Sequence, residues 1–161
     1  AGFGGRLVGA MIENIDYKGY DINVHLSPIY AKLLNDFSSH STGNHIIHYC
    51  DSSVVNYEEV SNVYPYDMVF TSPPYKNIEI YRCCTAMTDK EWHDLYVRTF
   101  TSLWKGLIPG GWMIININMD IYTSSLECIL GECTEKTLLT KTKKNSYDEY
   151  VYAWKKPSLS L

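Results

Sequence analysis

The sequence lacks long hydrophobic runs and has no excess of basic residues. No apolar stretch approaches the ~20 residues that a transmembrane helix requires, so we expect no membrane-spanning helix and no membrane partner. The net charge is −4 and the pI is about 5.7. Dedicated nucleic-acid-binding domains are usually basic. Any contact with nucleic acid is therefore expected from a local patch or from another region.

Cysteine pairs of the C-x-x-C type are also missing. The sequence has 5 cysteines, and the adjacent Cys83 and Cys84 have poor geometry for a disulfide. Reduced thiols and a cytoplasmic location are the simplest interpretation. His45, His48 and Cys50 are close in sequence, but alternation along a strand would turn His45 away from the other two. We therefore expect no metal site.

What the sequence does contain is the alternation of an α/β protein. Its 161 residues suit a single domain. Short apolar runs alternate with amphipathic segments, and Thr88-Asp-Lys-Glu91 is a capping box that opens a helix. A closing hairpin makes the expected sheet mixed, though mostly parallel. We expect helices over 5–14, 26–37, part of 52–64, the segment after Thr88 and 123–131, and strands over 17–22, 46–50, 67–71, 112–118, 135–143 and 148–156, with a turn at Asn145-Ser146 between the last two.

Three features along the chain suit the binding of a cofactor: a glycine turn before a predicted helix, and an aspartate at the end of each of the next two predicted strands. Ala1-Gly-Phe-Gly-Gly5 precedes a predicted helix, and its glycines let the backbone approach a ligand closely. Asp21 ends the next strand, where an acid can accept two ribose hydroxyls, and Asp51 ends the strand after it. Each acid alone could instead cap a helix. Together the three favour a nucleoside-type cofactor.

Thr71-Ser-Pro-Pro-Tyr75 is the most specific pattern in the chain. Its two prolines stiffen the loop and remove two N–H donors, which leaves carbonyl groups able to face a ligand. The Ser72 hydroxyl and the Pro73 carbonyl can hold the hydrogens of an exocyclic amine, and Tyr75 offers a ring on which a base can stack. Alone the pattern could be a packed turn, but after a buried strand it favours chemistry on a base.

With these residues the sequence resembles the amino-group DNA methyltransferases, which use S-adenosylmethionine to modify adenine N6 or cytosine N4. The resemblance extends from residue 1 to about residue 157. It implies a Rossmann-like class I methyltransferase fold in one catalytic domain over 1–161. It also implies two sets of site residues, which are the catalytic Ser72, Pro73, Pro74 and Tyr75, and the cofactor-binding Ala1, Gly2, Phe3, Gly4, Gly5, Asp21, Ile22, Asp51 and Ser52.

Three departures from the family shape what we expect. The family's glycine turn follows a central strand, so we expect that an upstream segment supplies the first strand, which this sequence lacks. No stretch is long enough for a target-recognition domain, so sequence specificity would come from an upstream domain or from a separate subunit, as in restriction-modification systems, or would be slight. Ser72, preceded by Thr71, favours cytosine N4 over adenine N6 as the target.

Other functions remain open from the sequence. RNA base methyltransferases share this pattern, mostly with Asn in place of Ser72. A non-catalytic methyltransferase-like subunit would suit the acidic charge, although such a subunit does not need the four residues Ser72, Pro73, Pro74 and Tyr75, here called the tetrad, to be intact. A dehydrogenase would use the glycine turn and Asp21 but has no use for the tetrad. Lys76 and Arg82 after the tetrad could contact phosphates or lie in an ordinary surface loop, and the later lysines (Lys136, Lys141, Lys143, Lys144, Lys155 and Lys156) favour a solvated hairpin face.

Overall fold

The computed structural model describes residues 2–76, 87–140 and 148–158. The chain forms two compact units, Ala1–Ser52 and Ser53–Leu161. Each unit has its own sheet and its own cluster of buried hydrophobic side chains. Among the helices that the structure describes, none has both the length and the apolar character needed to cross a membrane.

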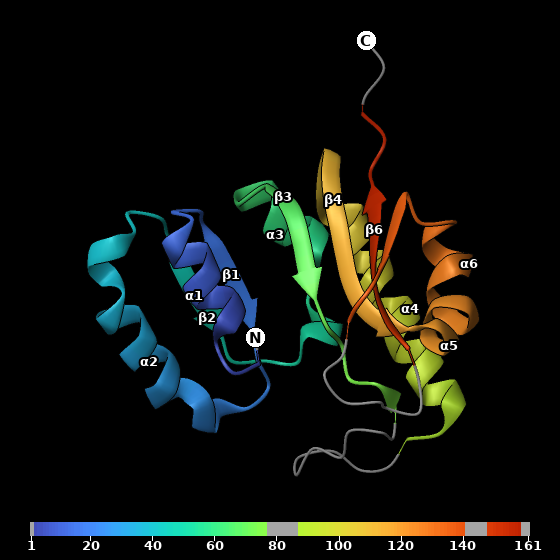
Figure 1. The fold of residues 1–161 in the computed structure, drawn as a ribbon, viewed down its shortest axis with the longest axis horizontal. Coiled ribbons are helices and arrows are strands. Elements are labelled where there is room, and N and C mark those ends of the chain that lie inside the picture. Colours follow the sequence, from blue (N-terminus) through green and yellow to red (C-terminus); the bar gives the residue numbers. More distant parts are fainter. Residues whose placement is uncertain (1, 77–86, 141–147, 159–161) are drawn as a thin grey trace. The chain divides into compact units, whose positions relative to one another are not determined.

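The first unit combines a two-stranded parallel sheet with two helices (Figure 1). Its core forms where Leu7 and Met11 from one helix pack against Tyr30 from the other. Because these three side chains are almost fully buried, they stabilise the unit through apolar burial. Its elements are α1 (Gly5–Ile12), β1 (Tyr17–Tyr20), η1 (Val24–Leu26), α2 (Ser27–Asp36), η2 (Ser38–His40) and β2 (His45–His48).

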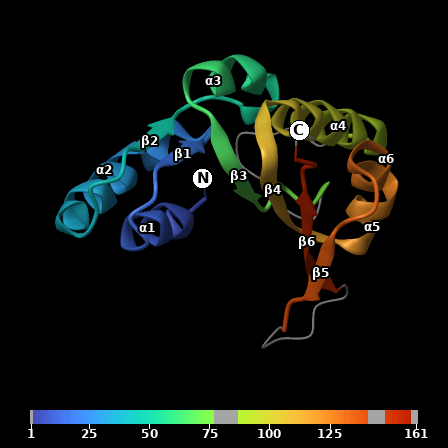
Figure 2. The same ribbon diagram turned by 90° about the horizontal axis from the view of Figure 1, so that it is seen from above.

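The second unit contains a four-stranded mixed sheet in the order β3-β4-β6-β5. The first pair is parallel and the other two pairs are antiparallel. In the view from above, α4, α5 and α6 lie over one face of this sheet (Figure 2). Its elements are η3 (Ser52–Val54), α3 (Tyr57–Val63), β3 (Tyr66–Thr71), α4 (Asp89–Gly106), β4 (Leu107–Asn118), α5 (Met119–Ile121), the π-helical turn η5 (Tyr122–Leu126), α6 (Glu127–Leu130), β5 (Glu135–Leu138) and β6 (Glu149–Lys155).

Strand β4 and helix α4 form the framework of the second unit. Alternate residues of β4, Met113, Ile115 and Ile117, are fully buried, as expected for one face of a strand packed under helices. Helix α4 begins where the sequence predicts, because the Thr88 side chain accepts from the Glu91 N–H while the Glu91 carboxylate accepts from the Thr88 N–H. This framework fixes the end of β3 that carries the tetrad.

The α/β fold class is confirmed, and the differences from expectation are local. The strands divide into two sheets, since among the described residues β1 pairs with β2 alone and β3 with β4 alone. The helix expected over 123–131 is interrupted by η5. The strand expected over 112–118 begins earlier, at Leu107, and contains an irregularity at Gly110, whose φ is 82°. The closing hairpin is present, while its turn at Asn145-Ser146 lies outside the described residues.

Candidate functional site

The glycine turn of the first unit leaves open space at the start of α1. Gly2 and Gly4 have φ angles of 68° and 88°, which side-chain-bearing residues rarely adopt. A Cβ on Gly4 would clash with Leu33, whereas a Cβ on Gly5 would meet no atom within 4 Å. Because the first N–H groups of a helix lack intrahelical partners, this turn presents backbone donors beside a free volume.

Asp21 follows β1 directly, and its carboxylate is held in place by two donors. The backbone N–H of Asn23 donates to Oδ1 over 2.9 Å, and the Tyr30 hydroxyl donates to Oδ2 over 2.6 Å. Burial by itself would raise the pKa of Asp21, whereas the hydrogen bonds from Tyr30 and Asn23 lower it, and the resulting pKa lies below its usual value. Asp21 is therefore a fixed carboxylate, and a carboxylate is a group that can accept hydrogen bonds from ligand hydroxyls.

Tyr30 of α2 connects Asp21 to the glycine turn. Its hydroxyl lies within hydrogen-bonding distance of both the Asp21 carboxylate and the Gly2 carbonyl, and its single proton serves one acceptor at a time. Burial and the Asp21 carboxylate both raise the pKa of Tyr30, so the hydroxyl keeps that proton. In the sequence, Tyr30 lies within the helix expected over 26–37, and its position alone does not reveal this role. The available signal is that a buried tyrosine usually seeks a polar partner for its hydroxyl.

The other predicted cofactor residues lie in the same unit. Phe3 is 95% exposed and Ile22 is 54% exposed, so both side chains are available to a ligand. Asp51 and Ser52 are half-buried and follow β2. Ala1 lies outside the described residues. The structure therefore brings Gly2 and Asp21 together through Tyr30, with the other cofactor residues elsewhere in this unit.

The two histidines of β2 contact a tyrosine ring and a serine hydroxyl. His48 stacks on Tyr20 with ring centroids 5.1 Å apart, and the His45 Nε2 lies 3.4 Å from the Ser41 hydroxyl. Within the described ranges, no three side chains of His, Cys, Asp or Glu form a group that could hold a metal ion. His45 and His48 therefore contact neighbouring side chains within the first unit.

The Ser72–Tyr75 tetrad lies in the second unit, directly after β3. Two tyrosine hydroxyls bind it to the framework. The Tyr75 hydroxyl donates to the Asn116 carbonyl of β4 over 3.1 Å, and the Tyr96 hydroxyl donates to the Pro74 carbonyl over 2.6 Å. The Lys76 N–H in turn donates to the Tyr96 hydroxyl over 3.1 Å. The backbone on both sides of Tyr75 is therefore held by one buried side chain.

Tyr75 differs from the expectation of an open stacking surface. Its side chain is only 4% exposed and belongs to the core of the second unit. The ring is buried because the Tyr75 hydroxyl binds the backbone of β4, which places the ring inside the core. In this conformation the ring packs against protein, and a base could stack on it only after a local rearrangement.

Two acceptors of the tetrad remain free. Ser72 is exposed, and its hydroxyl makes no hydrogen bond within the part of the chain that the structure describes. The same holds for the Pro73 carbonyl, whereas the Pro74 carbonyl is occupied by Tyr96. The tetrad thus offers an oxygen pair at the carboxyl end of a parallel strand, where α/β proteins bind ligands.

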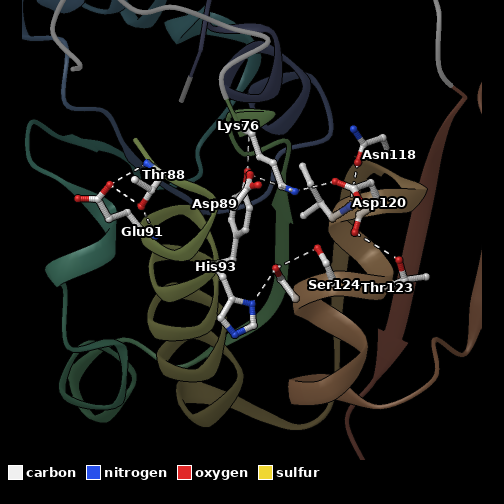
Figure 3. Close-up of polar contacts among 12 residues, drawn as sticks. Lys76, Thr88, Asp89, Glu91, His93, Asn118, Asp120, Thr123 and Ser124 are labelled. Atoms are coloured by element: carbon white, nitrogen blue, oxygen red, sulfur yellow. Dashed lines mark hydrogen bonds and ion pairs between the residues drawn. The ribbon is translucent and has the colours of Figure 1, made fainter. Parts of the chain in front are cut away.

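Lys76 is held by charge as well as by its backbone. Its Nζ lies 2.7 Å from Oδ2 of Asp120 and 3.7 Å from Oδ1 of Asp89 (Figure 3). The hydrogen bond to Asp120 raises the pKa of Lys76. The backbone φ of Lys76 is 49°, an uncommon value for a residue other than glycine. Because two carboxylates already neutralise this ammonium group, it is poorly suited to the phosphate contact considered from the sequence, and Arg82 lies outside the described residues.

A hollow lies beside this ion pair at the carboxyl end of β4. Its volume is about 220 Å³, and Asn118, Asp120 and Tyr150 contribute to its wall together with Met119 and Asp148. Asn118 caps α5, since its side-chain oxygen accepts from the Ile121 N–H over 3.0 Å. Two of its lining residues, Asp120 and Asp148, carry carboxylates, which can accept hydrogen bonds.

The lysines of the hairpin region are partly structural. The Lys136 Nζ lies 4.1 Å from the centre of the Tyr150 ring, in a cation–π contact. The Lys156 ammonium donates to the carbonyls of Trp104, Lys105 and Leu107, which compensates the C-terminus of α4. Lys155 lies over the Trp112 ring, and Lys141, Lys143 and Lys144 lie outside the described residues.

The comparisons with known proteins agree with this architecture. No family model matches the sequence, and no curated protein does. The fold is similar to that of an rRNA methylase from Streptococcus thermophilus (TM-score 0.57, 11% identity, 98% of this chain and 82% of that chain). It is also similar to a SAM-dependent methyltransferase from Methanosarcina mazei (TM-score 0.58, 9% identity, 95% and 87%) and to the N-methyltransferase NodS from Bradyrhizobium japonicum (TM-score 0.56, 10% identity, 89% and 74%). The chain therefore has the class I methyltransferase fold.

Proposed function

We propose that this chain transfers a methyl group from S-adenosylmethionine to the exocyclic amine of a base in DNA, with cytosine N4 favoured over adenine N6. The observation that carries the proposal is a pair of acceptors directly after β3, the Ser72 hydroxyl and the Pro73 carbonyl, which have no hydrogen-bond partner among the described residues. An attacking amine needs acceptors for its hydrogens, and these acceptors stabilise the positive charge that builds on its nitrogen.

The first unit suits the cofactor. Asp21 is a fixed carboxylate able to accept from a ribose diol, and the volume at Gly5 lets the backbone approach the amino-acid part of the cofactor. When bound, S-adenosylmethionine supplies an electrophilic methyl group on a sulfonium. Tyr30 orients the carboxylate that binds it, because its hydroxyl donates to Asp21.

The residues of the tetrad have separate roles in this proposal. Ser72 and Pro73 bind the amine and orient the nitrogen lone pair, and holding the reacting atoms in line supplies most of the acceleration. Pro74 and Tyr75 fix the loop through their contacts with Tyr96 and Asn116. The amine itself is the nucleophile, so the reaction requires no cysteine and no metal. The base has to leave its stack to reach these acceptors.

RNA is the second candidate substrate. It is favoured by the similarity of the fold to a protein described as an rRNA methylase. The same acceptor pair would hold the amine of an RNA base, so the two candidates differ in the nucleic acid and not in the chemistry. A partner or an additional domain that selects the sequence is part of either proposal, because the acidic charge of −4 gives the chain little attraction for phosphates.

Product analysis tests the proposal and separates the candidates. Purified protein is incubated with methyl-labelled S-adenosylmethionine and with DNA or RNA, and the digested nucleosides are identified by mass. N4-methylcytosine or N6-methyladenine from DNA is the expected product, and Ser72→Ala should lower its yield while the exposed Ser124→Ala does not. If methylated nucleosides came from RNA alone, the substrate would be RNA and not DNA. Cofactor binding without any product would contradict the proposed activity and favour a non-catalytic subunit.

A further inference from the structure

The Tyr96 hydroxyl contacts the peptide groups on both sides of Tyr75. It donates to the Pro74 carbonyl over 2.6 Å and accepts from the Lys76 N–H over 3.1 Å. These two groups belong to the peptide bonds that precede and follow Tyr75. One side chain therefore fixes the orientation of two consecutive peptide planes immediately after the two free acceptors.

Tyr96 is itself rigidly held. It is 0% exposed and stacks on Trp92, whose ring centre lies 5.9 Å away at an interplanar angle of 26°. Both residues lie in α4, an 18-residue helix with a complete capping box. A buried ring on a long capped helix has few alternative rotamers, so its hydroxyl is a fixed reference point for the tetrad.

The Tyr96 hydroxyl binds one carbonyl of the tetrad and leaves another available. The Pro74 carbonyl is occupied by Tyr96, whereas the Pro73 carbonyl and the Ser72 hydroxyl make no hydrogen bond within the described residues. Because Pro73 and Pro74 both have restricted φ angles, fixing the Pro74 carbonyl limits the directions in which the preceding carbonyl can point.

We propose that Tyr96 is the positioning residue of the tetrad, and that its hydroxyl aims the Pro73 carbonyl and the Ser72 hydroxyl at the amine. This inference rests on the proposed function, since it assigns the aim of the same two acceptors. It gives Tyr96 no contact with the substrate. Its effect is on the geometry of the methyl-transfer step, where a small displacement of a reacting group lowers the rate strongly.

Tyr96→Phe tests the inference, because it removes the hydroxyl and keeps the ring that stacks on Trp92. The matched control is Tyr66→Phe, since the Tyr66 hydroxyl also binds a backbone carbonyl, that of Leu103 in α4, over 2.8 Å. Tyr66 begins β3, at the opposite end from the tetrad. Both variants lose a tyrosine hydroxyl that donates to a backbone carbonyl between α4 and β3 or its loop, so the loss of that donated bond alone would affect them similarly.

Two readouts distinguish positioning from stability. The first is hydrogen–deuterium exchange of the segment 72–76, in which Ser72, Tyr75 and Lys76 alone carry amide protons. Tyr96→Phe should accelerate this exchange and Tyr66→Phe should not. The second is kinetic: Tyr96→Phe should lower kcat by roughly 10- to 100-fold with little change in KM for S-adenosylmethionine, as expected when a reacting group is misaligned.

The outcomes separate this inference from the proposed function. If the wild-type protein methylates no nucleic acid, the proposed function fails, and exchange in the segment still determines whether Tyr96 holds the tetrad. If the wild type is active, equal kcat values for Tyr96→Phe and Tyr66→Phe would overturn the inference. Unchanged exchange of the segment in Tyr96→Phe would overturn it as well.

Discussion

The Tyr30 hydroxyl and the Asp21 carboxylate lie 2.6 Å apart, which connects helix α2 to the end of strand β1. The same hydroxyl reaches the Gly2 carbonyl of the glycine turn. Two features that are separated in the sequence and predicted to bind the cofactor are thus held by one buried phenol. Within the first unit, this contact fixes the geometry of the residues proposed to bind the cofactor.

Tyr30→Phe should weaken cofactor binding without unfolding the first unit. The ring that packs on Leu7 and Met11 is retained, while Asp21 loses a donor that orients it. We expect the Kd for S-adenosylmethionine to rise by roughly tenfold, equivalent to about 1.4 kcal/mol. Isothermal titration calorimetry measures it, with Tyr49→Phe as control because Tyr49 is 39% exposed. Equal Kd values for the two variants would contradict the assignment.

Asp21 should stabilise the protein only above the acid range. Its pKa is lower in the folded protein than the ordinary value of 3.8, so its contribution is present above that value and is lost as the pH falls through the folded pKa. The difference in unfolding free energy between wild type and Asp21→Asn should be constant at pH values above about 5 and should shrink below about 4. Urea titrations at several pH values measure this difference. A difference that grows toward low pH would have the wrong sign.

The start of α1 allows a variant that separates stability from binding. A Cβ would meet no atom within 4 Å at Gly5 or at Gly9, and both residues lie in the same helix. Gly5→Ala and Gly9→Ala should therefore each raise stability, by about 0.5 kcal/mol. Only Gly5→Ala should weaken the binding of S-adenosylmethionine, raising its Kd by roughly tenfold, since the methyl group of the new alanine would fill the space beside the turn. Equal affinities in the two variants would remove the glycine turn from the cofactor site.

At position 76, a glycine variant should be more stable than an alanine variant, which is the reverse of the order inside a helix. The φ of 49° at Lys76 costs a side-chain-bearing residue about 1 kcal/mol, so Lys76→Gly should be more stable than Lys76→Ala by about that amount. At Lys90, within α4, the order should be reversed, since glycine is about 1 kcal/mol worse than alanine inside a helix. Urea unfolding of the four variants measures both differences. The same order at both positions would show that the backbone of Lys76 is not strained.

The sequence predicts the elements of this fold better than it predicts their contacts. The capping box at Thr88 and the position of Asp21 after β1 depend on neighbouring residues, which is why local patterns reveal them. The roles of Tyr30 and Tyr96 depend on partners 9 and 22 residues away in the chain. Periodicity assigns both tyrosines to the apolar face of a helix and cannot indicate which carbonyl or carboxylate the hydroxyl reaches.

Tyr75 illustrates the same limit within the candidate site. An aromatic residue after two prolines indicates a stacking platform, but the sequence does not show that its hydroxyl reaches Asn116, 41 residues later, and buries the ring. Lys76 likewise suggests a phosphate contact until its pairing with Asp120, 44 residues away, is known. Long-range polar pairing determined both outcomes.

The role of the acceptor pair is tested by the single-turnover rate of methyl transfer by Ser72→Ala, measured at saturating S-adenosylmethionine with Ser124→Ala as control. Ser72 supplies one of the two free acceptors at the end of β3, so its loss should reduce the rate by roughly 100-fold and leave the Kd for the cofactor unchanged. A Ser72→Ala rate equal to that of the wild type would contradict the central claim that these acceptors hold the amine.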